Sequence, residues 1–218
     1  MSTYKVDLHT HSQASKDGAL TEADYERALT NGQLDTIAIT DHNTAEFALD
    51  LRRTLGERII VGEEIATLEG EIIGLFLTET IPPFLSARET VKRIKAQKGL
   101  VYVPHPFETV RKGITAEALE GIAESVDIIE VHNGRAVFQN RSELAREWSV
   151  QHEVPGAASS DGHGPRGWGR TYSVVTAMPT RQNLVTLLHQ ATYEAHWPGV
   201  LGVLYPKLNR LRKKFAHG

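Results

Sequence analysis

The stretch Val6-Asp7-Leu8-His9-Thr10-His11 joins a short apolar run to two histidines that stand one residue apart. Side chains two residues apart share a face of an extended segment, so His9 and His11 can bind one metal ion together. Taken alone, such a pair lies more often on a protein surface than in a metal site. The stretch therefore predicts a first strand that ends in a candidate pair of metal ligands, to be tested against the rest of the chain.

Similar side chains follow other strand-like runs. We expect strands over residues 5–8, 36–40, 58–61, 72–77, 100–103, 127–131, 154–158 and 171–176, most of them separated by helical patterns. Candidate ligands follow at least five of these strands: His9 and His11, His42, Glu64, His105, and Asp161 with His163. A barrel gathers all its strand ends on one face, whereas an open sheet gathers them mainly at its switch point. The alternation of strands and helices therefore predicts an α/β barrel with a parallel sheet.

Composition limits the classes of function. The 218 residues suffice for one core, so we expect a single domain over residues 1–218. A net charge of -3 argues against a broad cationic surface for nucleic acid but leaves a local groove open. The absence of cysteine excludes disulfides, thiolate metal sites and cysteine nucleophiles. Without a signal-like N-terminus or an apolar stretch of about 18 residues, we expect a cytoplasmic protein with no membrane partner.

The candidate ligands lie in five short segments that occur in a fixed order. They are His9-Thr10-His11 with Asp17, Thr40-Asp41-His42, Gly62-Glu63-Glu64, Val103-Pro104-His105-Pro106 and Ser160-Asp161-Gly162-His163. In this order they resemble the PHP family, the polymerase and histidinol phosphatase domain, over residues 6–169. Any one segment is a weak signal, whereas five in order are specific.

The resemblance implies a distorted, seven-stranded, TIM-like (β/α) barrel with two or three divalent ions at the carboxyl ends of its strands. The implied ligands are His9, His11, Glu64 and Asp161 for a first ion, Glu64 and His105 for a second, and Asp17, His42 and His163 for a third. Family members are mostly phosphoesterases that act on phosphomonoesters, including histidinol phosphate, nucleotides and phosphotyrosine. Polymerase-attached members include exonucleases and inactive scaffolds. A metal-dependent phosphomonoesterase is the expected function.

The residue types agree with this chemistry. Imidazole and carboxylate donors without sulfur suit Zn, Mn or Fe. Closely spaced divalent ions clamp phosphate oxygens, activate a bridging water and stabilise the leaving alkoxide, so we expect no protein nucleophile. Glu64 and Asp161 then act as bridging ligands around that metal-activated water. His42 or His163 would donate a proton to the leaving oxygen only if the third ion is absent.

Two positions leave alternatives open. Many family members have a histidine where this chain has Glu71, in the segment Glu71-Ile72-Ile73-Gly74-Leu75. A carboxylate at Glu71 can still bind the second ion, but it favours a harder metal than imidazole does. Asn133 either binds metal or phosphate, or it forms the turn into Gly134.

A phosphate also needs cationic or N–H donors besides the metals. The arginines close in sequence to the motifs are Arg111, Arg135, Arg166 and Arg170. Of these we expect Arg135 and Arg170 to bind phosphate. The glycines of residues 161–170 predict a loop over the mouth of the site, in which Trp168 either packs the loop or stacks on an aromatic leaving group.

The substrate stays open between a small phosphomonoester, such as a nucleotide or sugar phosphate, and a phosphate on a macromolecule. The segment between His105 and Asn133 is too short for an extra folded lid, and an open mouth admits a phosphopeptide or an oligonucleotide end. Competing functions are an exonuclease or phosphodiesterase, hydrolysis of an amide or lactone, and a non-catalytic metal-stabilised binding module. The last of these predicts missing ligands, whereas the implied positions are all filled.

The C-terminal part of the chain, residues 193–218, has a different character. Between Lys207 and Lys214, basic residues alternate with Leu208 and Leu211. This pattern predicts a basic amphipathic tail or helix that packs on the barrel and has no part in the chemistry. Contact with a partner or an anionic surface is the alternative.

Overall fold

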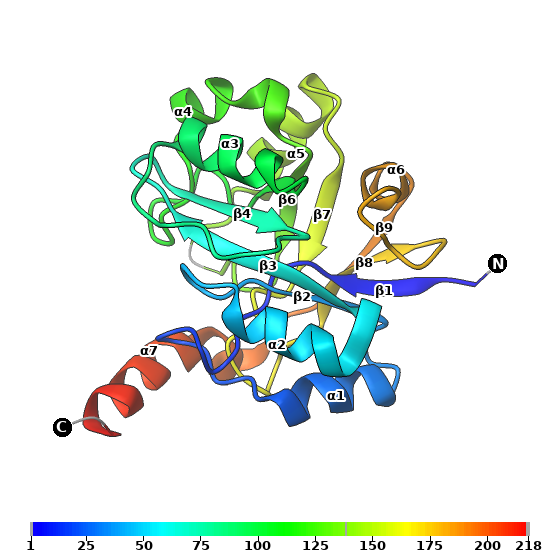
Figure 1. Cartoon of the computed structure of the whole chain (residues 1–218), viewed down its shortest axis with the longest axis vertical. Coiled ribbons are helices and arrows are strands. Elements are labelled where there is room, and N and C mark those ends of the chain that lie inside the picture. The colour runs from blue at the N-terminus through cyan, green and yellow to red at the C-terminus, as the bar shows by residue number, and fades with distance from the viewer. Residues whose placement is uncertain (1, 138, 217–218) are drawn as a thin grey trace.

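One mixed sheet curls into a nearly closed barrel in the computed structural model, which describes residues 2–137 and 139–216 (Figure 1). The strands are β1 (Tyr4–Asp7), β2 (Thr36–Ile39), β3 (Ile59–Ala66), β4 (Glu71–Leu75), β5 (Leu100–Val103), β6 (Ile128–Asn133), β7 (Gly156–Ser159), β8 (Thr171–Val175) and β9 (Thr192–Ala195). Their order in the sheet is β7-β6-β5-β4-β3-β2-β1-β8-β9. The two sides of the barrel meet where the backbone N–H of Ala158 in β7 donates to Ser173 Oγ in β8 over 2.9 Å.

The helices surround this sheet. They are α1 (Glu22–Thr30), α2 (Glu46–Leu55), α3 (Ala87–Ala96), α4 (Ala116–Glu120), α5 (Ser142–Gln151), α6 (Leu184–Leu188) and α7 (Gly199–Ala216), with 3-10 turns η1 (Gly56–Arg58) and η2 (Ala123–Ser125). Helix α2 packs on β2 and β3, α3 on β4 and β5, α5 on β6, and α6 on β8. Helix α7 extends at the lower left of Figure 1, at the opposite side of the molecule from the N-terminus. None of the helices in the described part of the chain is both long and apolar enough to cross a membrane.

The expected α/β barrel is present, but the expected seven parallel strands are wrong in number and direction. Strands β1, β2 and β3 are parallel, as are β5, β6 and β7, whereas β4, β8 and β9 pair antiparallel with their neighbours. Residues 67–70 are too few for the crossover that parallel pairing requires, so β4 returns beside β3 as a hairpin. Strand β9 was missed because Thr192–Ala195 contains no apolar run and is mostly exposed.

The period-two alternation of the strands decides which side chains enter the barrel. In β3, Ile60 belongs to the apolar cluster that the strands share inside the barrel, and Glu64 follows on the same face. Val61 and Ile65 instead pack with the outer helices. Glu63 shares this outer face, where its Oε2 accepts a hydrogen bond from the Ile81 N–H over 2.8 Å. The predicted ligand Glu64 therefore points into the barrel, and Glu63 points away from it.

The reversed direction of β4 explains the position of Glu71. In the parallel strands, carboxyl ends gather at one rim of the barrel. Strand β4 begins at that rim because it runs antiparallel, with Glu71 paired opposite Ala66 and Ile73 opposite Glu64. Glu71 alternates in phase with Ile73, which lies in the interior cluster. The hairpin therefore brings a further carboxylate to the same rim as Glu64.

Glu63 predicts a pH dependence of stability. Burial raises the pKa of its carboxyl from 4.5 to about 8. Folding thus favours the protonated form, so the free energy of unfolding falls as the pH rises from 4.5 through about 8. We expect Glu63→Gln to make this decline shallower, because the share that Glu63 contributes is lost, and to be more stable than the wild type by on the order of 2 kcal/mol near pH 8. Urea unfolding in the presence of chelator across this pH range measures the difference, and parallel curves for the two proteins would contradict it.

Candidate metal centre

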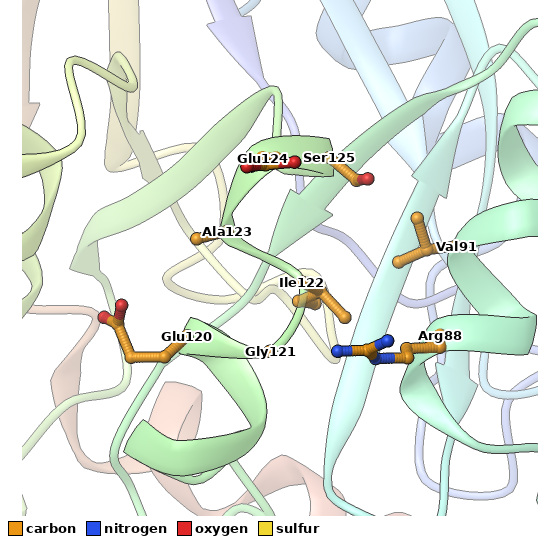
Figure 2. A pocket seen from close by; sticks show the side chains of 8 residues that line it. All are labelled: Arg88, Val91, Glu120, Gly121, Ile122, Ala123, Glu124 and Ser125. Atoms are coloured by element: carbon orange, nitrogen blue, oxygen red, sulfur yellow. The ribbon is translucent and has the colours of Figure 1, made fainter.

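Two hollows of the molecule differ in their chemistry. One, of about 500 Å³, lies between α3 and α4 and carries Arg88, Glu120 and Glu124 (Figure 2). The groups of possible metal ligands found in the described residues all lie elsewhere. They surround a pocket of about 290 Å³ at the carboxyl rim of the barrel, lined among others by Asp17 and His105. This second pocket is the candidate site.

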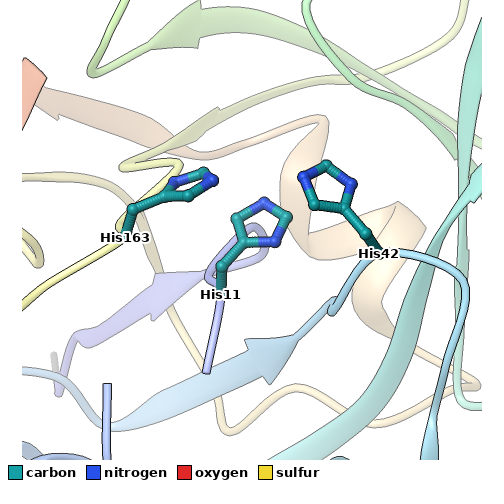
Figure 3. Close-up of side chains that lie close together, drawn as sticks. All are labelled: His11, His42 and His163. Carbon is teal, nitrogen blue, oxygen red and sulfur yellow. The ribbon is translucent and has the colours of Figure 1, made fainter. Parts of the chain in front are cut away.

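All eight predicted metal ligands lie at this rim. His9 and His11 follow β1, Asp17 lies in the loop before α1, His42 follows β2, Glu64 lies on β3, His105 follows β5, and Asp161 and His163 follow β7. Figure 3 shows the rings of His11, His42 and His163 side by side although they come from three separate segments. The barrel topology therefore assembles residues that are distant in sequence.

The first predicted group has the spacing of ligands around one ion. His9 Nε2 lies 3.1 Å from His11 Nε2 and 3.4 Å from Glu64 Oε1. His11 Nε2 lies 3.4 Å from Glu64 Oε2 and 3.5 Å from Asp161 Oδ1. Four ligands at about 2.0–2.2 Å from a tetrahedral ion are separated by about 3.4 Å, so these four side chains fit a divalent ion with little rearrangement.

The second group includes Glu71, as the sequence allowed. His105 Nε2 lies 3.0 Å from Glu64 Oε1 and 3.9 Å from Glu71 Oε2. The other Glu71 oxygen lies 3.9 Å from His42 Nδ1. The Glu71 carboxylate thus lies between the imidazoles of His42 and His105 and beside Glu64, where it can be a ligand of the second ion.

The third group is centred on one oxygen of Asp17. Its Oδ1 lies 3.4 Å from His42 Nε2 and 3.5 Å from His163 Nε2. This oxygen is buried and has no hydrogen-bond partner among the described residues. Buried polar atoms normally find a partner, so an unpaired oxygen that faces two imidazoles fits a position beside a cation.

The buried carboxylates of the site and the neighbouring imidazoles shift one another's pKa values. Burial by itself lowers the pKa of His42, but Glu64 and Asp17 raise it to about 10. Burial raises the pKa of Glu64, yet His42 and His9 hold it well below its usual range. Burial also raises the pKa of Asp161, which Arg135 and His9 bring well below its usual range. The raised pKa values of His9 and His42 mean that these two imidazoles supply positive charge, whereas burial and the neighbouring histidines lower the pKa of His11. Metal binding would release the protons of His9 and His42.

Glu130 is the main site residue that the sequence analysis missed. Its Oε1 lies 3.2 Å from His9 Nδ1, and its Oε2 accepts hydrogen bonds from the His105 N–H over 2.7 Å and from Asn133 Nδ2 over 2.8 Å. Such partners fix the orientation of histidine ligands. The sequence did contain a signal for Glu130, which is a lone carboxylate inside the apolar run of β6. Inward-facing strand positions elsewhere in the barrel are mostly apolar, so a carboxylate at such a position indicates a functional role.

Asp41 lies behind the candidate ligands and orients the residues around it. It accepts hydrogen bonds from the Ser12 N–H over 2.7 Å, from the Ser12 hydroxyl over 2.5 Å and from the Ser15 hydroxyl over 2.6 Å. Ser15 Oγ in turn lies 3.2 Å from His11 Nδ1. Asp41 thereby holds the loop that carries the second histidine of the pair.

Two candidate ligands have a strained backbone. His105 has φ of 29° and Asp161 has φ of 50°, in a region that residues other than glycine rarely adopt. Such conformations persist only where surrounding contacts enforce them, and they gather at functional sites. The contacts of Glu130 with His105 and of the arginines with Asp161 supply this enforcement.

The arginines at the site are Arg111 and Arg135 rather than the expected Arg135 and Arg170. Arg135 Nη1 lies 3.1 Å and 3.0 Å from the two oxygens of Asp161, and Arg111 Nη1 lies 2.9 Å from Oδ2. Arg170 is exposed and lines a different hollow beside the start of α7. Nearness in sequence to Asp161 was misleading because the loop turns away from the site after His163.

The structure also places Asn133 and Trp168. Asn133 Oδ1 accepts the Arg135 N–H over 2.8 Å, as in a turn, while its Nδ2 lies 3.3 Å from Asp161 Oδ2. Its side chain therefore forms the turn and faces the site at once. Trp168 is buried, and its ring packs edge-on against that of Tyr25 with the ring centroids 5.3 Å apart. Trp168 therefore anchors the loop to the rest of the fold.

Helix α7 also reaches the pocket, which the sequence analysis did not expect. Lys207 and Arg210 line the pocket, and Arg210 forms an ion pair with Asp17. The prediction of a basic helix that packs on the barrel is correct. That the helix has no part in the chemistry stays a prediction, although its basic side chains line the pocket. Its basic residues alternate with apolar ones because one side of the helix faces the pocket.

Sequence comparison finds similar proteins in Methanocaldococcus jannaschii. The uncharacterized protein MJ1587 is 32% identical over 149 residues, which are 62% of this chain and 87% of that protein. The uncharacterized protein MJ0417 is 36% identical over 163 residues, which are 73% of this chain and 65% of that protein. No protein-family model matches the chain.

Solved structures share the fold. A two-domain protein from Bacteroides vulgatus that contains a predicted PHP-like metal-dependent phosphoesterase has a TM-score of 0.72 at 22% identity, covering 96% of this chain and 70% of that chain. PsfC from Pseudomonas syringae has a TM-score of 0.67 at 14% identity, covering 99% and 100%. Endonuclease Q in complex with a duplex that carries an abasic lesion has a TM-score of 0.63 at 13% identity, covering 90% and 60%.

The ligand groups predict that metal stabilises the fold. An ion present at about 100 times its Kd adds about 2.7 kcal/mol to the free energy of unfolding, or roughly 5–10 °C in Tm for a chain of this size. We expect chelator-treated protein to gain this stability when Zn, Mn or Fe is added, as measured by thermal unfolding. The double variant His9→Ala with His11→Ala is the control and should gain less. Equal shifts in both proteins would mean that the ions bind elsewhere.

Proposed function

The chain belongs to the PHP family, and from this premise we propose that it is a metal-dependent phosphoesterase that hydrolyses a phosphomonoester. The observation that carries the proposal is the spacing of His9, His11, Glu64 and Asp161, whose neighbouring donor atoms lie 3.1–3.7 Å apart. When bound, divalent ions supply a clamp for phosphate oxygens and a nucleophilic water at neutral pH. Zn, Mn and Fe all suit the donors, and the proposed number is two or three ions.

The walls of the pocket favour an anionic substrate. Arg111 and Arg135 stand on one side, and Lys207 and Arg210 of α7 also line the pocket, together with Lys16. A guanidinium group can donate two parallel hydrogen bonds to a phosphate. The buried Nε of Arg135 has no hydrogen-bond partner among the residues that the structure describes. A neutral amide or lactone offers no charge for these cations to bind. This ring of cations therefore supports phosphate hydrolysis over the hydrolysis of an amide or lactone.

The chain's own residues divide the work of the reaction. Arg135 and Arg111 are placed to hold a phosphate against the ligand cluster, since both already contact a carboxylate at its edge. Glu130 and Asp41 fix the orientation of the histidines, Glu130 by direct contact with His9 and Asp41 through Ser15. With its ring nitrogens between Glu64 and Asp17, His42 serves as a ligand and not as the proton donor in the proposed three-ion form.

A phosphodiester substrate is the second candidate. Endonuclease Q, which shares the fold, was solved with a DNA duplex at its active site. Here the segment between β5 and β6 forms only a loop, α4 and η2, so no folded lid is present in this described segment. An oligonucleotide end therefore remains a possible substrate beside nucleotides, sugar phosphates and phosphopeptides.

A pair of model substrates separates these functions. We expect metal-stripped protein to regain hydrolysis of para-nitrophenyl phosphate when Mn, Zn or Fe is added back, since the ligands fit such ions. Release of para-nitrophenol from the monoester and from the bis ester is the measurement. Preference for the bis ester would support the nuclease candidate. Fully loaded protein that is inactive on both esters and on a panel of phosphopeptides and nucleotides would count against the proposal.

Adjacent glutamates offer a matched test of the ligand assignment. We expect Glu64→Gln and Asp161→Asn each to lower kcat/KM at least about a hundredfold, because each removes a charge that holds the ions. Glu63→Gln is the control, since this side chain faces the outer helices and should leave activity unchanged. Steady-state kinetics at saturating metal, with circular dichroism to verify folding, measures the effect. Full activity of folded Glu64→Gln would contradict the assigned site.

A further inference from the structure

A single amide of helix α7 holds two loops of the metal centre together. Asn209 is buried, and its Nδ2 donates hydrogen bonds to the backbone carbonyl of Asp17 over 2.8 Å and to that of His163 over 2.9 Å. These carbonyls belong to the loops after β1 and after β7. The amide therefore fixes the relative position of two side chains from the third group of candidate ligands.

Arg210, the next residue of α7, acts on the side chain of the same aspartate. Its guanidinium binds Oδ2 of Asp17, with Nε at 3.1 Å and Nη2 also in contact. The other oxygen, Oδ1, has no hydrogen bond within the described part of the chain and faces the imidazoles of His42 and His163. The two oxygens thus have separate roles, in which Arg210 orients the carboxylate and Oδ1 is presented to the pocket.

Further contacts anchor the helix on the same two loops. Lys213 Nζ donates to the carbonyls of Gln13 over 2.7 Å and Ser15 over 2.5 Å, just before Asp17. The ring of Tyr205 lies directly on Gly164, where an added Cβ would come within 2.6 Å of the ring. The absence of a side chain at this glycine permits the close approach beside the third-group histidine. Helix α7 therefore grips both loops, each at more than one point.

We propose that α7 is a clamp that assembles the third metal site, with Asn209 and Arg210 as its positioning residues. The inference rests on the proposed metal-dependent function but concerns ion binding alone. Asp17, His42 and His163 come from loops, which an ion would otherwise have to order at a cost in binding free energy. The clamp orders the loops of Asp17 and His163 in advance. The first group depends less directly on α7, because Glu130 holds His9, Ser15 and Asp41 hold His11, and Glu64 lies on β3.

Counting bound ions tests the clamp without reference to turnover. We expect the Kd of the third ion to be raised about 10- to 100-fold in Arg210→Gln and Asn209→Ala. At a free metal concentration between the two Kd values, the wild type should therefore hold one more ion than either variant. The tighter ions should stay bound. Arg212→Gln is the matched control, because it removes an exposed charge from the same helix. Equilibrium dialysis with elemental analysis gives the number of ions, and isothermal titration gives each Kd.

A second measurement uses the thermodynamic linkage between the third ion and the docking of α7. A helix that only stabilises the fold would show no such linkage. If α7 and the third ion stabilise each other, the ion must also hold α7 in place. We expect saturating metal to slow tryptic cleavage within α7 of the wild type and of Arg212→Gln, but not of Arg210→Gln. This comparison remains informative even if Asn209→Ala fails to fold.

Several results would overturn the clamp. They are a wild-type protein that binds no third ion, variants whose ion number and affinities equal those of the wild type, and a folded variant that loses all ions equally. Inactivity of wild-type protein that holds three ions would instead count against the proposed phosphoesterase and leave the clamp intact. Loss of the clamp and failure of the proposed function therefore give different results.

Discussion

The burial of Glu64 and Asp161 at the rim of the barrel is the constraint on which the rest of the site depends. A buried carboxylate without a partner costs several kcal/mol, more than the packing of neighbouring side chains returns. Both carboxylates are at most 2% exposed, so cations must surround them. Imidazoles meet them from the interior and guanidinium groups from the rim. A site built in this way already has the charge distribution that divalent ions require.

The cations themselves are held by a second set of buried acids. Glu130 contacts His9 and the backbone of His105, and Asp41 fixes the loop after His11. These acids sit where the alternation of a strand or the start of a loop points inward, so the order of the site comes from the barrel. The left-handed backbone at His105 and Asp161 fits this account, because the strain is maintained by hydrogen bonds and ion pairs to neighbouring residues.

The sequence sufficed to predict the barrel and the ligand cluster, because strands recur with charged residues at their ends and a barrel brings such ends together. It did not predict the direction of β4, since hairpins and crossovers differ in the length of a connection and not in the pattern of the strands. It did not predict β9 either, because Thr192–Ala195 contains no apolar run. Glu130 was missed because a carboxylate in an apolar run has no local signal of its partners. Arg170 was misplaced because a loop's path after His163 depends on the tertiary packing of Trp168 and α7.

The two parts of the site differ in what makes them rigid. The first group stands on or directly after strands whose backbone hydrogen bonds continue through the sheet, and local opening there would disrupt the barrel. The third group combines loops that α7 holds from outside through Asn209 and Arg210. Because α7 meets solvent on its other side, its docking can weaken without disturbing the core. Changes in residues 199–216 can therefore alter the third group of candidate ligands while the first group and the barrel stay in place.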